Sequence, residues 1–195
     1  MIIDDSDSKE SVVEKALNSL TSLAEIGLLQ NVKLKELVKM VAPLLIHPNK
    51  WIRFAAIGYL CAAAKKLPKI DSLCIVTPAV RPYLTTEIGL LDTHVLIDNL
   101  RPHMPRKVYN AALKFAQGKM PDHDSKLDLA SYLRNLGITD EEAAGLPSMR
   151  YHISKTAKSL SRDGQAVSSD ALGRVPPRDI SIHTVFITPP AHEVS

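Results

Sequence analysis

The sequence lacks the features that would assign it to a membrane, to secretion or to nucleic acid. Its longest uncharged apolar run, residues 54–64, is well short of the roughly 20 residues that span a bilayer. The first ten residues are acidic and contain no basic region followed by an apolar one, which excludes a secretory signal. Lysine and arginine total 24 against 21 acidic residues, and a net charge of +3 is too small to argue for a nucleic-acid partner. We therefore expect a soluble, cytoplasmic protein.

The sequence also has few groups that carry chemistry. Its two cysteines, Cys61 and Cys74, lie in apolar runs of helical spacing, where a free thiol behaves as a small hydrophobe, and this usage is typical of a reducing compartment. The eight glycines never form a phosphate-cradling loop, and no kinase, hydrolase or zinc motif occurs. We therefore expect no catalytic residue, no metal ligand and no cofactor in this chain.

What the sequence does contain is helical periodicity. With 45% hydrophobic residues, the 195-residue chain is long enough to bury one sizeable core. Apolar residues recur at spacings of three and four, which indicates helices with one buried side. The predicted helices are 11–29, 34–45, 51–66, 70–84, 92–100, 108–117 and 127–136. A capping-box spacing from Thr139 to Glu142 predicts a further helix, which Gly145 and Pro147 interrupt and which resumes at Ile153.

The stretch 47–66 contains the most apolar of the predicted helices, and it also has the clearest signal for a helix start. Pro48 prevents the preceding helix from continuing, and Asn49 suits the cap of the next one. A helix that is apolar on nearly every side must lie between neighbours, so we expect a buried spine. Trp51 suits an exposed ligand platform or a packing anchor, and we favour the anchor. Arg53 is expected to bond to a carbonyl or an acid of the adjacent repeat.

Two proline-containing strings predict a repeat. Val-Ala-Pro-Leu-Leu around Pro43 and Val-Thr-Pro-Ala-Val around Pro78 place a helix-bending proline at the same point, about 35 residues apart. Pro82 is expected to end the second of these helices. A period of this length, built from helix pairs, is typical of an α-solenoid. The predicted fold is therefore all-α, a solenoid of stacked helical hairpins.

The predicted boundaries follow the changes in composition. We expect a flexible N-terminus at 1–10, the solenoid at 11–136, an additional helical segment at 137–160 and a flexible or disordered tail at 161–195. Within the tail, Ile180 to Thr188 is a β-branched island that suits an extended segment pairing with something outside the chain.

Lysines form a candidate basic patch for an acidic lipid or an acidic partner, and an ordinary solvated surface is the simpler interpretation. The set comprises Lys33, Lys35, Lys39, Lys50, Lys65, Lys66 and Lys69.

The string HPNKWIRFAAIGYLCAAAKKL resembles the second half of a HEAT repeat. Ile52 and Arg53 stand at the Val-Arg pair of that repeat, and Ala55 and Ala56 stand at its small residues. Asn49 replaces the usual aspartate, which weakens the charged ladder that the resemblance implies.

The strings LLIHPNKWIRFAAIGYL and VTPAVRPYL more specifically resemble the HEAT region of the regulatory subunit of class III phosphatidylinositol 3-kinase. The similarity covers about Leu17 to Leu136, and Ile180 to Pro189 is similar to the segment ahead of the family's WD-repeat propeller. It implies a fragment without kinase-like domain or propeller that acts as a non-catalytic scaffold in endosomal sorting and autophagy. The implied partners are the lipid-kinase catalytic subunit and a Beclin-type coiled-coil subunit. Contact with late endosomal and autophagic membranes is implied to be indirect, through the complex.

Two other classes of function stay open. One is a HEAT scaffold of the transport-receptor or phosphatase-scaffold type, with a groove for an acidic peptide or a partner subunit. The other is an enzyme with an unfamiliar site, which would need a pocket where titratable groups converge. His94, His103 and His123 are the candidates for such a cluster, although His123 lies between two aspartates in a stretch that suits a solvated helix cap.

Overall fold

The structure, a computed structural model, describes residues 5–118 and 128–166, and within these ranges all regular elements are helical. The first half contains α1 (Asp5–Glu25), α2 (Asn31–Val41), the 3-10 helix η1 (Ala42–Ile46), α3 (Lys50–Lys66), α4 (Lys69–Asp71), the π-helix η2 (Ser72–Val76), α5 (Thr77–Val80) and the 3-10 helix η3 (Arg81–Tyr83). The second half contains α6 (Thr93–Asn99), α7 (Arg106–Ala116), α8 (Leu129–Asn135) and α9 (Leu146–Ala166). No described helix is long and apolar enough to cross a membrane.

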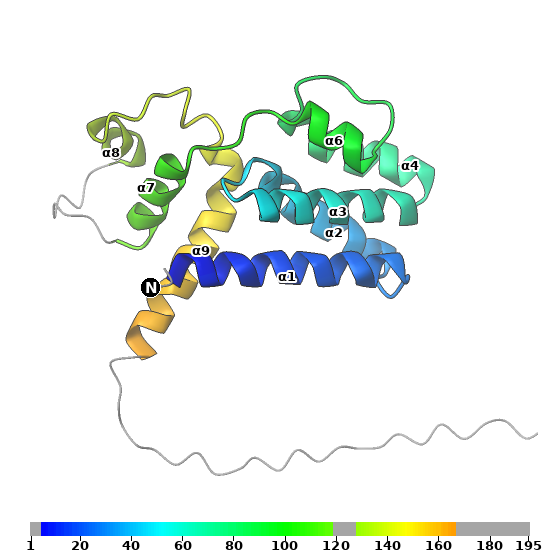
Figure 1. Ribbon diagram of the computed structural model, residues 1–195, viewed down its shortest axis with the longest axis horizontal. Coiled ribbons are helices and arrows are strands. Elements are labelled where there is room, and N and C mark those ends of the chain that lie inside the picture. The colour runs from blue at the N-terminus through cyan, green and yellow to red at the C-terminus, as the bar shows by residue number, and fades with distance from the viewer. Residues whose placement is uncertain (1–4, 119–127, 167–195) are drawn as a thin grey trace, which may run out of the picture.

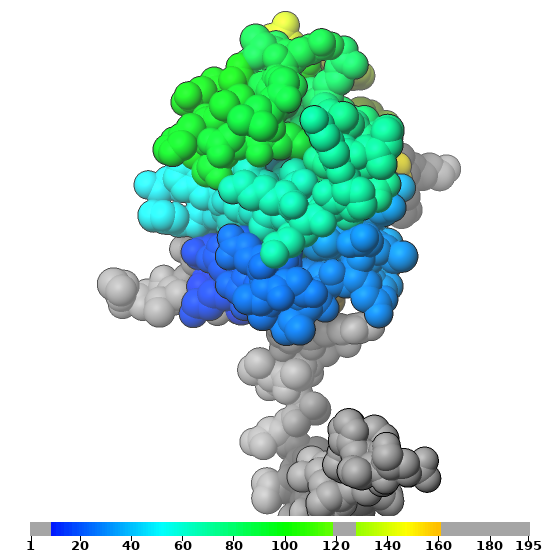
Figure 2. Space-filling model, turned by 90° about the vertical axis from the view of Figure 1, so that its right-hand side faces the viewer, coloured from blue at the N-terminus to red at the C-terminus, as the bar shows by residue number. Residues whose placement is uncertain are grey.

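The first half of the chain forms two layers of helices. One layer consists of α1, α3 and α6, because α3 contacts α1 on one side and α6 on the other (Figure 1). The second layer consists of α2 with η1 and of the run from α4 to η3. Viewed from the end, these segments stack in chain order, from the first hairpin to the connection that carries α6 (Figure 2). This stacking of helical hairpins confirms the predicted all-α solenoid.

The two proline strings lie against each other in the second layer. Pro43 lies in the first turn of η1 and Pro78 in the first turn of α5, and η1 contacts both α5 and η3. Instead of only bending one α-helix, each proline lies where the helix type changes, since proline removes a backbone donor from the ladder. Pro82 lies within η3, and that helical run ends at Tyr83, one residue after the predicted terminator.

The last three helices form a unit at the side of the solenoid. α7 packs on α8 and α9, and α9 returns to contact η1 (Figure 1). The Thr139 to Glu142 capping box is present, but a turn follows it and the helix begins at Leu146. A Cβ at Gly145 would lie 2.8 Å from the Cδ1 atom of Ile46, so this glycine permits close packing of the turn. Pro147 occupies the first turn of α9, where it is tolerated.

Several predicted boundaries were wrong. Residues 5–10, expected to be flexible, belong to α1, and residues 161–166, expected to be tail, belong to α9. A change in composition was taken for the end of a helix in each case, whereas both helices continue through it. Residues 167–195, with the Ile180 to Thr188 island, lie outside the described residues, as does His123.

The core supports most of the predicted spine. Nine residues of α3 are buried, among them Ile52, Tyr59 and Leu60. Cys61 is buried as expected, whereas Cys74, in η2, is exposed, and Val76 is the buried residue of that element. The expectation that both cysteines pack in the core was therefore wrong for Cys74.

Candidate functional site

The most polar part of the interior is the turn between η1 and α3. Asn49 caps α3 as predicted, since its Oδ1 atom accepts a hydrogen bond from the Trp51 amide at 2.9 Å. The other end of the same side chain donates from Nδ2 to a carboxylate oxygen of Glu10, at 2.7 Å. Asn49 therefore joins the start of α3 to α1.

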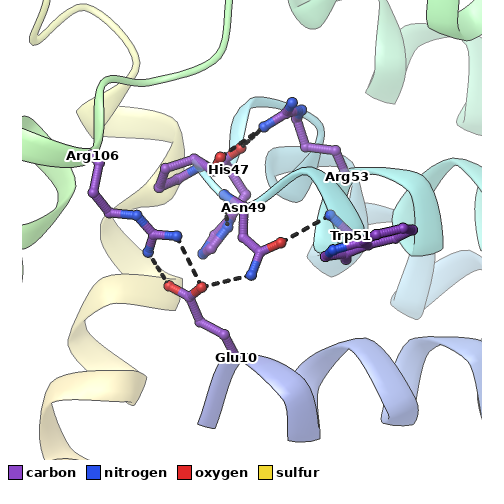
Figure 3. Close-up of polar contacts among 7 residues, drawn as sticks. Glu10, His47, Asn49, Trp51, Arg53 and Arg106 are labelled. Atoms are coloured by element: carbon purple, nitrogen blue, oxygen red, sulfur yellow. Dashed lines mark hydrogen bonds and ion pairs between the residues drawn. The ribbon is translucent and has the colours of Figure 1, made fainter. Parts of the chain in front are cut away.

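Glu10 is the centre of this polar junction. Its side chain is 8% exposed, and both carboxylate oxygens accept from the guanidinium of Arg106 at the start of α7 (Figure 3). The second of these bonds measures 3.1 Å, and the pair joins residues 96 positions apart. A bidentate pair of this kind fixes direction as well as distance. We call Glu10, His47, Asn49, Arg53 and Arg106 the junction.

Arg53 bonds within its own turn. Its Nη1 atom donates to the carbonyl oxygens of His47 at 2.7 Å and of Pro48 at 2.9 Å. The predicted bond to a carbonyl is therefore present, but the expected partner in the adjacent repeat was wrong. With asparagine at position 49, Arg53 has no acid in the turn, and it binds the carbonyl groups that the turn leaves open.

The His47 ring is held neutral inside the junction. It is fully buried, and its Nδ1 atom accepts from the Asn49 amide at 3.0 Å. Burial, with further contributions from His152, Arg106 and Arg53, lowers the pKa of His47 to about 3. The ring lies edge-on to Tyr109, with centroids 4.8 Å apart, and to His152, with centroids 5.5 Å apart. Burial likewise lowers the pKa of His152 and raises that of Tyr109 to about 12.

A cavity of about 490 Å³ opens beside the junction, between α1, α7 and α9. Its floor includes Ile52, Tyr109 and Leu113, and His152 and Glu10 also line it. Glu10 is already bound to Arg106 and Asn49, and the two histidines are held as neutral rings. The arrangement therefore suits packing of helices better than proton transfer.

The histidines proposed for an enzyme site do not form it. His94 on α6 and His103 in the connection to α7 are both exposed, and neither lines this cavity. Across residues 5–118 and 128–166, no group of three or more histidine, cysteine, aspartate or glutamate side chains is placed to hold a metal ion. The histidines that do approach each other are His47 and His152, which are 105 positions apart and share no motif.

Trp51 was wrongly predicted as a buried anchor. Its side chain is 55% exposed and points away from the ion pair (Figure 3). The next residue, Ile52, lies about 100° further round the helix and takes the buried position at the start of α3. The Lys50 ammonium lies 5.0 Å from the centroid of the Trp51 ring, a cation–π distance.

The basic residues do not form one patch. Lys35 is paired with Asp71 of α4 at 2.9 Å, and Lys33 with Glu36 at 2.8 Å. The exposed members are divided among three helices. They are Lys33 and Lys39 on α2, Lys50, Lys65 and Lys66 at the two ends of α3, and Lys69 at the start of α4. The two ends of α3 are about 22 Å apart at 1.5 Å per residue.

Sequence reasoning missed the residues that complete the junction. Glu10 fell in a stretch expected to be flexible, and Arg106 in a connector. An acidic residue inside an apolar helix stripe was the one available signal, because Glu10 precedes Val13 and Leu17 at helical spacing.

Comparison with known proteins finds curated relatives that are named as VPS15 kinases. Among curated relatives, the chain is 35% identical over 146 residues to "Probable serine/threonine-protein kinase vps15" of Dictyostelium discoideum, which covers 70% of this chain and 7% of the relative. It is 24% identical over 206 residues to "Serine/threonine-protein kinase VPS15" of Arabidopsis thaliana, which covers 94% of this chain and 14% of the relative. The chain thus spans a small part of the length of the relatives it matches.

The family match falls on the two-layered part of the structure. The family described as PIK3R4-like, middle domain, matches residues 6–113, from the first turns of α1 into α7. The matched region is a middle domain and not a kinase domain, and it contains Glu10, the turn before α3 and Arg106. Since the match covers more than half of the sequence, this chain belongs to the PIK3R4-like middle-domain family.

Proposed function

We propose that this chain is a non-catalytic scaffold module of the regulatory subunit of a class III phosphatidylinositol 3-kinase complex. The observation that carries the proposal is the match of residues 6–113 to the PIK3R4-like middle domain, supported by relatives that are named as VPS15 kinases. Stacked helical hairpins suit this role, because a long lateral surface can contact several proteins without local chemistry. The match also favours this proposal over a scaffold of the transport-receptor or phosphatase type.

The proposed partners are the lipid-kinase catalytic subunit and a Beclin-type coiled-coil subunit. The proposed site of action is the cytoplasmic surface of late endosomal and autophagic membranes, which the module reaches through the complex. Endosomal sorting and autophagy are the processes that the assembly serves in this proposal. The kinase-like domain and the propeller of the parent protein are proposed to lie in the rest of its length.

Affinity capture of the longer parent protein from cells tests the proposal. We expect the class III catalytic subunit and the coiled-coil subunit to be recovered together with the parent protein. When Ile52→Asp misfolds the module, smaller amounts of both subunits should be recovered. Ile52 is fully buried, so this change disrupts the core. Lys107→Asp, at an exposed position of α7, is the matched control. Recovery of a phosphatase catalytic subunit or transport cargo, without the lipid kinase, would contradict the proposal.

A further inference from the structure

Helix α3 carries exposed aromatic side chains that its role in the core does not explain. Trp51 is 55% and Phe54 44% exposed, although the same helix contributes nine buried residues. Their rings meet edge to face, with centroids 6.3 Å apart. Two large apolar side chains are thus packed on each other while both face water, which is typical of an interaction surface.

The same side of α3 continues over a glycine. Residues three, four and seven apart share one side of a helix, so Trp51, Phe54, Gly58 and Lys65 lie in one line. A Cβ at Gly58 would meet nothing closer than the Thr21 hydroxyl at 3.9 Å, which is ordinary contact, so internal packing does not require glycine. Glycine inside a helix is unfavourable relative to alanine. Its presence leaves the backbone of α3 open to close approach from outside.

The charges that α3 itself carries have one sign, and Asp92 at the cap of α6 is an acidic neighbour near its C-terminal end. Helix α3 contains no aspartate or glutamate, and its exposed lysines are Lys50 at the start and Lys65 and Lys66 in the last turn. From Lys50 to Lys65 the helix rises about 22 Å. Helix α1 borders the line on one side, where Thr21 faces Gly58, and α6 contacts α3 on the other (Figure 1).

We propose that this α3 stripe, made of Lys50, Trp51, Phe54, Gly58 and Lys65, docks an acidic amphipathic helix of a protein partner. Apolar side chains of the partner pack on the two aromatic rings, and its backbone comes closest to α3 at Gly58. Its carboxylates pair with the lysines at the two ends of the stripe, which a helix of about 15 residues spans. The α3 stripe is thus a specific binding surface for an acidic helix, which membership of a complex alone does not identify.

Intrinsic fluorescence of the full chain tests the proposal directly, because Trp51 is the sole tryptophan among the 195 residues. The probe is a helical peptide of about 16 residues with leucines along one side and glutamates flanking them. We expect the peptide to shift the tryptophan emission to shorter wavelength and to saturate. A matched peptide with lysines in place of the glutamates is expected to leave the emission unchanged.

Two variants separate binding from folding. Gly58→Leu fills the point of closest approach, and we expect about tenfold weaker peptide binding. Because an added Cβ already contacts Thr21 of α1, thermal unfolding of this variant is measured beside its binding, and Lys65→Glu tests the surface without touching the α1 packing. Lys65→Glu is expected to weaken binding of the glutamate peptide and to permit binding of the lysine peptide. Lys158→Glu, at an exposed position of α9, is the control and should change neither.

Three results would overturn the proposal. The first is equal binding of the two peptides, the second is unchanged binding by Gly58→Leu and Lys65→Glu, and the third is absence of any peptide-induced shift. Vesicles of phosphatidylserine provide a further arm: if they shift the emission and the glutamate peptide does not, the stripe meets a lipid surface and a helix partner is excluded. These outcomes are independent of the affinity capture described above, which tests the subunits that accompany the parent protein.

Discussion

The junction and the α3 stripe are neighbours in sequence and opposite in character. The junction buries the Glu10 carboxylate and the His47 ring, and half-buried Asn49 and partly exposed Arg106 bind them through hydrogen bonds. The stripe begins one residue after Asn49 and exposes two aromatic rings beside a lysine. Polar groups are inside and apolar groups outside, which reverses the usual distribution.

This reversal separates structural from functional residues. The junction groups stabilise the fold because removing any one of them leaves a buried partner without its bond. The stripe residues face water, so removing them changes stability little and leaves binding as the property that they serve. Substitutions in the junction should therefore lower the free energy of unfolding much more than substitutions in the α3 stripe.

The largest expected effect is loss of the ion pair. Arg106→Ala leaves the Glu10 carboxylate buried without its cation, although Asn49 still donates to it, and we expect the free energy of unfolding to fall by about 3 kcal/mol. Urea denaturation measures this. Lys107→Ala, one residue along and exposed, is the control. Adding Glu10→Gln should recover part of the loss, since the buried charge is then gone; a further loss of similar size would argue against the pair.

The next effect is acid destabilisation through His47. Its folded pKa is lowered to about 3, so below pH 6.5 the unfolded chain takes up a proton that the folded chain does not. Stability therefore falls as the pH decreases from 6.5 towards 3, by about 3 kcal/mol between pH 7 and pH 4. In His47→Asn, which keeps an acceptor for the Asn49 amide, the pH dependence should flatten, whereas His94→Asn should retain it.

A smaller effect is expected at the helix cap. Asn49→Ala removes both the cap of α3 and the bond to Glu10, and we expect a loss of about 1 to 2 kcal/mol, measured by thermal unfolding. Asn49→Asp restores the residue usual in HEAT repeats and keeps a cap oxygen. It also places a second carboxylate against Glu10, so this variant should have a lower free energy of unfolding than the unmutated chain at neutral pH. In acid, where the carboxylates are protonated, the two values should become similar. Equal stability of Asn49→Asp at neutral pH would show that Glu10 does not face position 49.

The smallest effect on stability is expected in the stripe. Trp51→Ala should change the free energy of unfolding by no more than about 0.5 kcal/mol, because the side chain is more exposed than buried. Ile52→Ala, at the adjacent buried position, should cost about 2 to 5 kcal/mol. A loss of several kcal/mol in Trp51→Ala would mean that the ring packs in the core after all and would remove the basis of the stripe.

Local signals in the sequence predicted local structure well. The spacing of apolar residues located the helices, and the Asn49 cap is formed by atoms two residues apart. The pairing of Glu10 with Arg106 has no local signal, because it depends on how α7 is placed after two hairpins. Trp51 was misjudged from the average behaviour of tryptophan. Its exposure, beside the fully buried Ile52, depends on how α3 is rotated against its neighbours, which no local pattern states.

The pair of Glu10 and Arg106 also has a consequence for the order of folding. It closes a loop of 96 residues, and closure of so long a loop costs entropy that only later contacts recover. The contacts among α2, α3 and η2 are closer in sequence and should form first. Substitutions at the pair should therefore accelerate unfolding and leave the refolding rate almost unchanged. The first turns of α1 would then be the last part of the chain to reach its native place and the first to leave it.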